Sequence, residues 1–562
     1  MRQSFTEWTK SGAPWVWLNA GAVAICLIMV VGLLSLIAVR GLGHFWPADI
    51  VQSTYVENDN KVRLIGERVQ VEAVPAEQLR DSGVKVPEGV EAMDRVLMKV
   101  GNRDHGGTDF IWILDDFNEE ISRPNMLFAA ERREWGNFYG YLRSIKENGK
   151  EVASHQGFEK DAEYETLWNE FQNRIDRALQ IHDQISDIEK DRIGSINYEL
   201  ERLRLKERSL QLKEVNDQSR YQEIDDRRAE LNAEYESLQG DLLDLYTAFN
   251  RDSITAEIAN GKIVEFKVAS VVRAFLPNDM SLVGKIGHYF AKIWEFLSAD
   301  PREANTEGGI FPAIYGTVLM VIIMSVMVTP FGVVAAVYLR EYAKQGFVTR
   351  VIRIAVNNLA GVPSIVYGVF GLGFFVYFLG GHIDDAFFPE AKPAPTFGTP
   401  GLMWASITLA LLTVPVVIVA TEEGLTRIPR AIREGSLALG ATKFETLMKI
   451  VIPMASPAIM TGVILAIARA AGEVAPLMLV GVVKLAPSLP LDGNYPFLHL
   501  DQKFMHLGFH IYDVGFQSPN VEAARPLVYA TALLLVAVIA MLNLSAIQIR
   551  NHLREKYKAL EM

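Results

Sequence analysis

The sequence predicts an α-helical integral membrane protein with six transmembrane helices and a large soluble insert between the first two. Two observations lead to this prediction, namely six long apolar runs and a separation of charge along the chain. Residues 41–308 contain about 51 acidic and about 34 basic residues, a net charge of about −17. The whole chain has a formal charge of −12, so the remaining residues carry about +5. An acidic soluble body is therefore joined to a basic membrane domain.

The six apolar runs are each long enough to cross a hydrocarbon core about 30 Å thick, which takes about 20 helical residues. They lie at roughly residues 15–39, 313–338, 354–380, 402–420, 457–483 and 526–547. The first run is too long for the apolar part of a cleaved signal peptide, and Arg40 follows it without a small-residue cleavage site. We therefore expect it to be retained as a transmembrane helix.

Basic residues concentrate in the segments that share one side of the membrane if the chain crosses it six times. These are the N-terminus, the connections after the second and fourth runs, and the C-terminal residues. Because cytoplasmic loops are enriched in Lys and Arg, we expect both termini in the cytoplasm and the insert in the periplasm. The predicted organisation is 1–40 for the N-terminus and first helix, 41–308 for the insert, 309–548 for the other five helices and 549–562 for a cytoplasmic tail.

The composition also limits the partners of the chain. A strongly acidic soluble body argues against nucleic-acid binding, which needs a basic surface. The sole cysteine, Cys26, lies inside the first apolar run, so an intrachain disulfide is excluded.

The insert contains two kinds of sequence pattern. Residues of about 60–155 and 251–276 contain strand-like runs of β-branched and aromatic residues, which predict a small β or α+β unit. Between them, within about 160–250, apolar residues keep a heptad phase typical of a coiled coil. The turn-like stretch "VNDQS" at 215–219 favours an antiparallel helical hairpin, with one continuous helix as the alternative. A hairpin with about 30 residues per arm would reach about 45 Å, at 1.5 Å per residue.

A short amphipathic stretch, "EGSLALGATKFETLMKIVIP", joins the fourth and fifth apolar runs. Gly440 follows Glu434 by six residues, and after nine more residues "IVIP" ends at Pro453. This spacing resembles the EAA signature of the permeases of ABC importers. Gly435 and Ser436 replace the two alanines of that signature, and Ile452 replaces its leucine.

The resemblance implies the type I ABC importer permease fold, with a coupling loop at 421–455. In that family the loop forms two short helices joined at the glycine, and it docks into a cleft of a cytoplasmic ATPase dimer. The residues assigned to this coupling are Glu434, Gly440, Ala441, Lys443, Phe444, Leu447 and Pro453. A helix that lies on membrane lipids is the alternative for such an amphipathic loop.

The chain lacks the phosphate-binding loop G-x-x-x-x-G-K-[ST] that an ATPase of this class would carry. We therefore expect ATP to be hydrolysed by a separate subunit. The chain itself is then a transport subunit, not an enzyme, and needs no cofactor of its own.

Four stretches of the membrane domain carry a narrower resemblance. "GGIFPAIYGTVLM" with "FGVVAAVYLREYA", "NNLAGVPSIVYGVFG", "TEEGLTRIPRAIREGSLALGATKFE" and "ARAAGEVAPLMLVG" resemble the A-type permease subunit of the bacterial phosphate-specific transport system. The resemblance implies uptake of inorganic phosphate across the inner membrane, with a homologous C-type permease, the ATPase dimer and a periplasmic phosphate-binding protein as partners. It covers residues 309–548 well and says little about the insert.

The fifth apolar run contains two charged residues, Arg469 and Glu473, four positions apart and hence expected on one helix face. An unpaired charge there costs about 2.5 to 3.5 kcal/mol on insertion scales. One interpretation is an ion pair that only fastens helix packing. The other is that the planar fork of Arg469 binds phosphate oxygens while Glu473 balances its charge in the absence of the anion. The resemblance implies a transport role for both residues.

In the third run, Pro363 is expected in mid-membrane, where it frees a carbonyl group that Ser364 or Tyr367 could satisfy. We assign Pro363 and Ser364 to the substrate pathway, with a kink that only shapes packing as the alternative.

Three other functions fit parts of the sequence. A permease for another oxyanion, such as sulfate or molybdate, would share the fold. A secondary transporter would explain the intramembrane charges but not the coupling loop. A phosphate-sensing membrane scaffold would explain the large insert.

Overall fold

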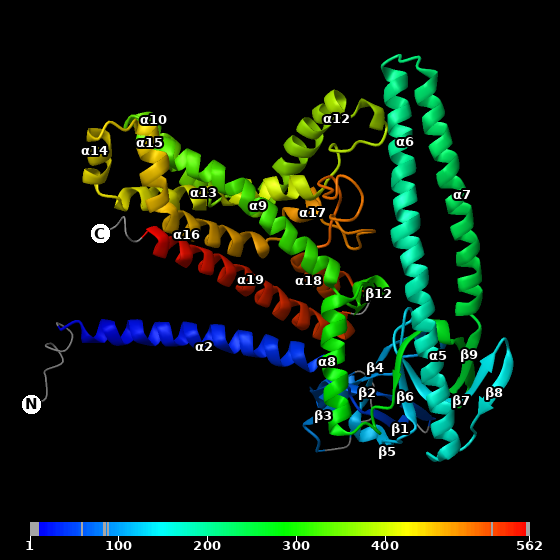
Figure 1. Cartoon of the computed structure of the whole chain (residues 1–562). Coiled ribbons are helices and arrows are strands. Elements are labelled where there is room, and N and C mark those ends of the chain that lie inside the picture. The colour runs from blue at the N-terminus through cyan, green and yellow to red at the C-terminus, as the bar shows by residue number, and fades with distance from the viewer. Residues whose placement is uncertain (1–10, 58–59, 82–85, 87–88, 519–520, 558–562) are drawn as a thin grey trace, which may run out of the picture.

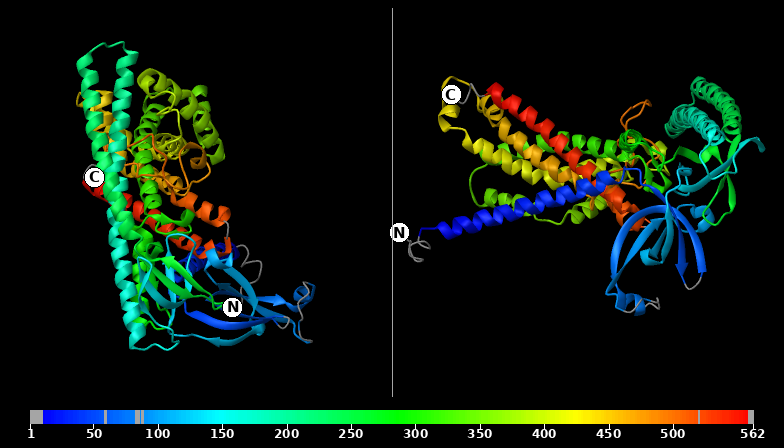
Figure 2. Two further views of the ribbon diagram at one scale, coloured as in Figure 1. Left: turned by 90° about the vertical axis from the view of Figure 1, so that its right-hand side faces the viewer. Right: turned by 90° about the horizontal axis from the view of Figure 1, so that it is seen from below.

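The computed structural model describes residues 11–57, 60–81, 86, 89–518 and 521–557. Within them the chain forms a bundle of long apolar helices and, beside one end of it, an insert of β-sheets and helices (Figure 1). α2 begins and α19 ends at the opposite end of the bundle from the insert (Figures 1 and 2).

Six helical segments in the described chain are long and apolar enough to cross a membrane, which confirms the predicted number. They are Trp15–Gly43, Phe311–Tyr342, Ser364–Phe387, Leu402–Arg427, Lys443–Ala471 and Ala524–Lys556. The elements that form and connect them are α2 (Ala13–Gly43), α9 (Phe311–Val337), η5 (Tyr338–Tyr342), α10 (Phe347–Leu359), α11 (Ser364–Phe370), η6 (Gly371–Gly380), α12 (Gly381–Phe387), η7 (Pro389–Ala391), α13 (Leu402–Arg427), α14 (Arg430–Ala438), α15 (Lys443–Thr446), η8 (Leu447–Val451), α16 (Ile452–Ala471), α17 (Leu477–Val480), α18 (Leu507–Tyr512), η9 (Asp513–Gln517) and α19 (Val521–Tyr557).

The third span begins at Ser364 and not at residue 354, so the prediction that Pro363 lies in mid-membrane was wrong. α10 ends at Leu359, and Pro363 is the N-cap of α11. Proline has no N–H and disfavours a helical residue before it, so the helix cannot run through. The apolar residues of α10 had merged it with the span in the sequence pattern.

α13 is the central helix of the bundle. Within its most apolar window 67% of the residues are buried, against 0% for α2. Glycines allow its neighbours to come close: a Cβ atom at Gly332 of α9 would lie 2.5 Å from the Val417 side chain, and one at Gly462 of α16 would lie 2.7 Å from Ala420. Small residues at helix crossings are how membrane helices gain van der Waals contact, so α9 and α16 pack directly on α13.

The insert contains two larger antiparallel sheets. The first has the strand order β4-β3-β2-β1-β5, and the second has the order β10-β9-β7-β6-β11 with β8 paired to β7. The strands are β1 (Ile50–Glu57), β2 (Asn60–Pro75), β3 (Ala92–Lys99), β4 (Phe110–Leu114), β5 (Asn118–Ser122), β6 (Leu127–Arg132), β7 (Phe138–Glu147), β8 (Lys150–Ser154), β9 (Asp252–Glu257), β10 (Ile263–Lys267), β11 (Val271–Phe275), β12 (Pro301–Arg302) and β13 (Glu307–Gly308). The short helices among them are α3 (Ala76–Asp81), α4 (Arg103–Gly106), η1 (Asp115–Phe117), η3 (Val268–Ser270) and η4 (Glu303–Asn305).

A helical hairpin is inserted between β8 and β9. It consists of α5 (Ala162–Ser186), η2 (Asp187–Ile193), α6 (Gly194–Leu212) and α7 (Gln218–Phe249). The chain reverses at residues 213–217, where the Asp217 side chain accepts a hydrogen bond from the Ser219 N–H and caps α7. Of the two predicted alternatives, the structure therefore has the hairpin. The insert thus combines β-sheets, as the strand-like runs predicted, with this hairpin.

The hairpin runs crosswise to the bundle helices and does not project away from the bundle (Figures 1 and 2). Its arm α6 contacts the loops at the end of the bundle nearest the insert. The Tyr198 hydroxyl donates to the carbonyl of Tyr495, and the Arg202 guanidinium lies 5.4 Å from the Tyr495 ring centroid. Farther along α6, Arg208 lines a cavity of about 500 Å³ together with residues of α12 and of the segment after it, among them Asp384 and Lys392.

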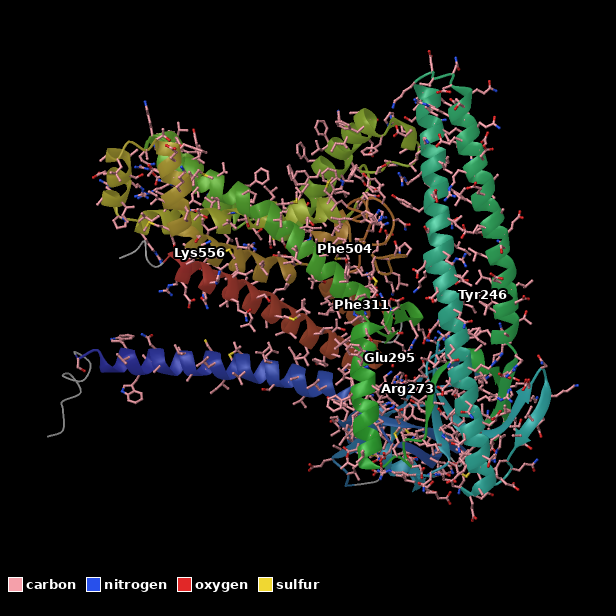
Figure 3. All side chains as sticks on the ribbon, viewed as in Figure 1. Tyr246, Arg273, Glu295, Phe311, Phe504 and Lys556 are labelled. Atoms are coloured by element: carbon pink, nitrogen blue, oxygen red, sulfur yellow. The ribbon has the colours of Figure 1, made fainter. Side chains whose placement is uncertain are left out.

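Within the insert, a charge cluster holds α8 (Leu282–Ser298), the helix that precedes the second span, against β6 and β11 (Figure 3). Lys292 Nζ lies 2.8 Å from Glu131 Oε2, and Glu295 pairs with Arg273 at 3.0 Å and with Arg302 at 2.8 Å. Burial alone would raise the pKa of the Glu131 carboxyl, but Lys292 and Arg273 outweigh it and lower that pKa to about 2. The carboxylate therefore stays ionised and paired over the physiological pH range.

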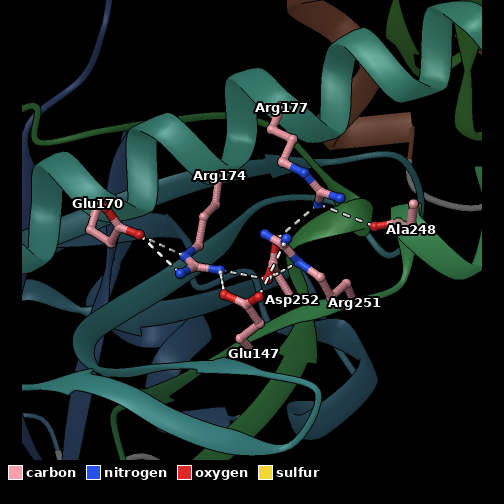
Figure 4. Close-up of polar contacts among 7 residues, drawn as sticks. All are labelled: Glu147, Glu170, Arg174, Arg177, Ala248, Arg251 and Asp252. Atoms are coloured by element: carbon pink, nitrogen blue, oxygen red, sulfur yellow. Dashed lines mark hydrogen bonds and ion pairs between the residues drawn. The ribbon is translucent and has the colours of Figure 1, made fainter.

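A second charge network joins the hairpin to the second sheet (Figure 4). The Asp252 carboxylate at the start of β9 is only 3% exposed and accepts ion pairs from Arg174 at 2.5 Å, Arg251 at 3.0 Å and Arg177 at 3.2 Å. Arg174 also pairs with Glu147 at 3.0 Å. The base of the hairpin is thus bound through side chains to the sheet from which it emerges.

Replacing Asp252 by alanine is expected to destabilise the insert by about 1 to 3 kcal/mol, because the buried Arg174 guanidinium loses one charged partner while it keeps Glu147 and Glu170. The loss can be measured by pulse proteolysis of the full-length protein in increasing urea, read on fragments of the insert. The matched control is Glu201→Ala, which removes an exposed pair with Arg204 at 2.6 Å and should cost less than about 1 kcal/mol. Equal losses in the two variants would contradict a structural role for the buried network.

Candidate functional site

The loop between the fourth and fifth spans has the two short helices that the family resemblance implied, α14 and α15, on either side of Gly440. Gly440 has φ of 88°, in the left-handed region that side chains rarely adopt. No heavy atom lies within 4 Å of the position that a Cβ would take, so the backbone conformation and not crowding favours glycine here. The Ala441 N–H donates to the Ser436 carbonyl at 3.3 Å and closes the turn.

The helix after the turn is longer than expected. Thr442 and Glu445 form a capping box at its start, with the Thr442 N–H donating to Glu445 Oε2 at 3.0 Å. The helix then continues through η8 and α16 to Ala471. Pro453 lies at its second α-helical position after the π-helical turn of η8, so its missing N–H does not end the helix. The loop and the fifth span are one helical segment.

The loop presents apolar side chains at the end of the bundle away from the insert. Leu439 is 91% exposed and Phe444 is 65% exposed, with Leu437 and Met448 also on the surface. Glu434 and Lys443 lie on the same exposed loop. Leu447 does not: it is buried with Leu425, Ile428, Val451, Ala455 and Ile459, so the prediction that it couples directly to an ATPase was wrong. Helical periodicity turns positions 444 and 448 outward and positions 447 and 451 inward.

Contacts that the sequence analysis missed hold the loop to the bundle. Arg433 Nη2 pairs with Glu341 Oε1 at 3.0 Å, and the same guanidinium donates to the carbonyls of Leu425 and Ile428 at 2.7 and 3.0 Å. Lys443 donates to the Glu341 carbonyl and lies 4.4 Å from the Tyr342 ring centroid. Glu341 is the single acidic residue in the otherwise basic connection between the second and third spans, and this pattern could have identified it.

The second candidate site lies where α16 ends. The helix stops at Ala471, Gly472 is the C-cap, and Glu473 lies in the break before α17. The prediction that Arg469 and Glu473 stack on one helix face was therefore wrong, and the fifth span ends well before residue 483. The break follows from Gly472 and from Pro476, which is the N-cap of α17.

Arg469 and Glu473 are nevertheless neighbours, with 3.7 Å between Arg469 Nε and Glu473 Oε1. This distance is too long for a hydrogen bond, and the side chains are 32% and 20% exposed. Within the described chain, the guanidinium makes no hydrogen bond to another residue. The pair is loose and open, so it does not close off the donors of Arg469 from an anion.

Pro363 and Ser364 stand at the start of α11, where Pro363 is exposed and Ser364 is half-buried. Ser364 and Tyr367 were the two predicted donors to the carbonyl group freed by Pro363. The Tyr367 hydroxyl fills this role, donating to the Leu359 carbonyl at 2.6 Å. α11 also packs on the break in the fifth span, because a Cβ at Gly368 would lie 2.6 Å from the Cα of Pro476. In the part of the chain that the structure describes, however, no hydrogen bond or ion pair joins Pro363 or Ser364 to Arg469 or Glu473.

The two candidate sites are therefore a loop held to the helix ends by Arg433 and Lys443, and a loosely paired arginine at a break in a span. Residues 328–558 match the family described as "Binding-protein-dependent transport system inner membrane component". The match covers the membrane domain after the insert and indicates a transport permease.

Three relatives narrow the class. "Phosphate transport system permease protein PstA 1" of Mycobacterium tuberculosis strain CDC 1551 is 37% identical over 247 residues, which are 43% of this chain and 71% of the relative. PstA of Mycobacterium leprae strain TN is 34% identical over 52% of this chain and 88% of the relative, and PstA of Yersinia pestis is 32% identical over 45% and 75%. The chain belongs to the PstA family of phosphate transport system permease proteins. The solved MetNI methionine ABC transporter aligns with a TM-score of only 0.32 at 18% identity, over 43% of this chain and 94% of that chain, and adds nothing to this assignment.

Proposed function

We propose that this chain is the A-type permease subunit of an ATP-driven importer of inorganic phosphate, in which it forms the translocation path with a homologous C-type subunit. The observation that supports the proposal most is the coupling loop of this PstA family member, whose apolar residues are exposed. The loop lies at the end of the bundle where α2 begins and α19 ends (Figure 1). From the basic residues at this end we assign it to the cytoplasm, and we therefore assign the insert with its sheets and hairpin to the periplasmic side of the inner membrane.

In this proposal the ATPase dimer docks on Leu439, Phe444 and Met448. The helix that begins at Lys443 carries Arg469 26 residues farther on, about 39 Å at 1.5 Å per residue. A rigid helix transmits a displacement along its length, so movement of the docked ATPase shifts the break that holds Glu473. ATP is bound by the partner, and this chain supplies the docking surface and the path.

Arg469 is the residue that we assign to phosphate recognition. Its guanidinium can form two parallel hydrogen bonds to phosphate oxygens, and Glu473 balances the charge when the anion is absent. Phosphate retains a proton near neutral pH whereas sulfate does not, so the Glu473 carboxylate can accept a hydrogen bond that only phosphate offers. A permease for sulfate or molybdate is the alternative that this chemistry disfavours.

The proposal is tested by co-purifying the chain with its partners and identifying the bound anion. Phosphate uptake by proteoliposomes that contain the complex and a periplasmic phosphate-binding protein should require ATP inside and survive collapse of ion gradients. Uptake driven by an ion gradient alone would instead indicate a secondary transporter, and capture of sulfate or molybdate would indicate a different oxyanion.

Arg469→Lys is expected to reduce phosphate uptake at least tenfold although it keeps the charge, because an ammonium group does not reproduce two parallel hydrogen bonds, and a tenfold effect corresponds to about 1.4 kcal/mol. The measurement is initial uptake at matched protein levels. Arg350→Lys, on the exposed face of α10, is the control and should transport normally. Normal uptake by the Arg469→Lys variant would remove Arg469 from anion recognition.

Phe444→Asp and Gly440→Pro should each abolish co-purification with the ATPase while the protein stays in the membrane. The first puts a charge into the docking surface, and the second breaks the turn, since proline fixes φ near −65°. Gly435→Ala is the matched control, because it lies inside α14 with no atom near the added Cβ and should bind normally. If both disruptive variants retained the ATPase, the loop would be a helix lying on lipid headgroups.

The hairpin is expected to be dispensable for the transport step, since the family's characteristic stretches all lie from residue 308 onward. Replacing residues 195–236 by a short Gly/Ser turn keeps the base of the hairpin, where Tyr246 donates to Glu189 at 2.7 Å. ATP-driven uptake at saturating phosphate should persist, with weaker capture at low phosphate. Complete loss of uptake by a variant that still enters the membrane and binds the ATPase would show that α6 is needed to hold the outer loops in a transporting arrangement.

A further inference from the structure

α8 carries an uncovered apolar stripe along its whole length. Leu282, Ile286, Phe290 and Trp294 follow one another at four-residue intervals and are 67%, 42%, 63% and 70% exposed. Val283 lies beside them at 79%, and the positions between them on the same face are Gly287 and Ala291. Residues four apart share one face of a helix, so these side chains form a single continuous surface. It contains no charged residue.

The opposite face of α8 is occupied. Lys285 binds Asp49 at 2.5 Å, Lys292 binds Glu131 at 2.8 Å, and Phe296 is buried. These contacts fix the helix about its own axis. Packing against the rest of the insert therefore fixes which face of α8 is exposed, and that face is the stripe.

α8 lies at the level where two membrane helices end. The Phe296 ring packs on Phe45, just after α2, at 5.1 Å between centroids, and the Ile310 N–H, just before α9, donates to the Phe296 carbonyl at 2.9 Å. From that point α8 runs crosswise to α2 (Figure 1). Trp46, itself 42% exposed, contacts Tyr289 of α8 at 5.9 Å. Tyr289 in turn contacts Phe290 of the stripe at 5.5 Å between ring centroids, so the stripe adjoins the end of α2, whose most apolar window has no buried residue.

We propose that α8 is an interfacial helix whose stripe lies in the lipid of the membrane leaflet on the insert side. A lipid surface fits better than a protein partner for two reasons. The stripe adjoins the lipid-facing surface of α2, and it combines aliphatic residues with Trp294 and the neighbouring Trp46, the residue type enriched at membrane–water interfaces. A helix with one apolar and one polar face lies in the plane of that interface, about 5 to 10 Å into the headgroup and acyl boundary. α8 thereby sets the height of the insert above the membrane.

The test uses the full-length protein in vesicles of phosphatidylethanolamine and phosphatidylglycerol, alone and as the purified transport complex. Cys26 is the only cysteine, so a Cys26→Ser background allows one spin label at a chosen position. The label is placed by Phe290→Cys on the stripe and, as the matched control, by Leu243→Cys on the hairpin, where the leucine is 69% exposed. Collision rates with oxygen, which concentrates in lipid, and with a water-soluble nickel chelate are then measured by electron paramagnetic resonance.

The expected result is a label at position 290 that oxygen reaches readily and the nickel chelate reaches at least tenfold less than at position 243. A label at position 290 that is open to the nickel chelate would place the stripe in water and overturn the proposal. A label that neither reagent reaches would also overturn it, because the stripe would then be covered by protein. If that cover appears only in the complex, the occupant is a partner subunit. If it appears in the isolated chain, the occupant is a second copy.

Discussion

The ion pairs that α8 makes with β6 and β11 are the constraint on which the arrangement of the two halves depends. Glu131 and Glu295 are nearly buried, and each would be costly to leave without a partner. Lys292, Arg273 and Arg302 satisfy them only when α8 lies against the second sheet. Because α8 leads into α9 within a dozen residues, fixing α8 to the sheet fixes the insert to the second span.

That attachment explains the course of the hairpin. The network around Asp252 binds the base of the hairpin to the same sheet, so the direction of its arms is set by the sheet and not by the membrane. The sheet directs α6 across the end of the bundle, where Tyr198 and Arg202 meet Tyr495. Any protein that docks on this end would meet α6 as well as the loops.

Within the bundle, breaks at glycine and proline are where the candidate functional residues gather. Pro363 ends the helix before the third span, Gly472 and Pro476 bound the break that holds Glu473, and Gly440 reverses the coupling loop. Each break exposes backbone or charge that a continuous helix would conceal. Between the turn at Gly440 and the break at Gly472, the helical segment from Lys443 to Ala471 is continuous. It therefore gives the coupling loop a stiff connection to Arg469.

The sequence by itself determined the number of spans and favoured the hairpin, because these depend on apolar run length and turn composition within short stretches. Its resemblance to ABC importer permeases implied the two short helices of the coupling loop. It also predicted that Tyr367 could satisfy the carbonyl freed by Pro363. Only the tertiary structure decided that Leu447 faces the core, that Glu473 lies beyond the end of its helix, and that the hairpin lies crosswise. The inward face of Leu447 and the course of the hairpin depend on contacts between residues far apart in the chain, such as Leu447 with Leu425 and Arg174 with Asp252. The end of the helix before Glu473 follows from Gly472 and Pro476, whose effect the apolar run had hidden.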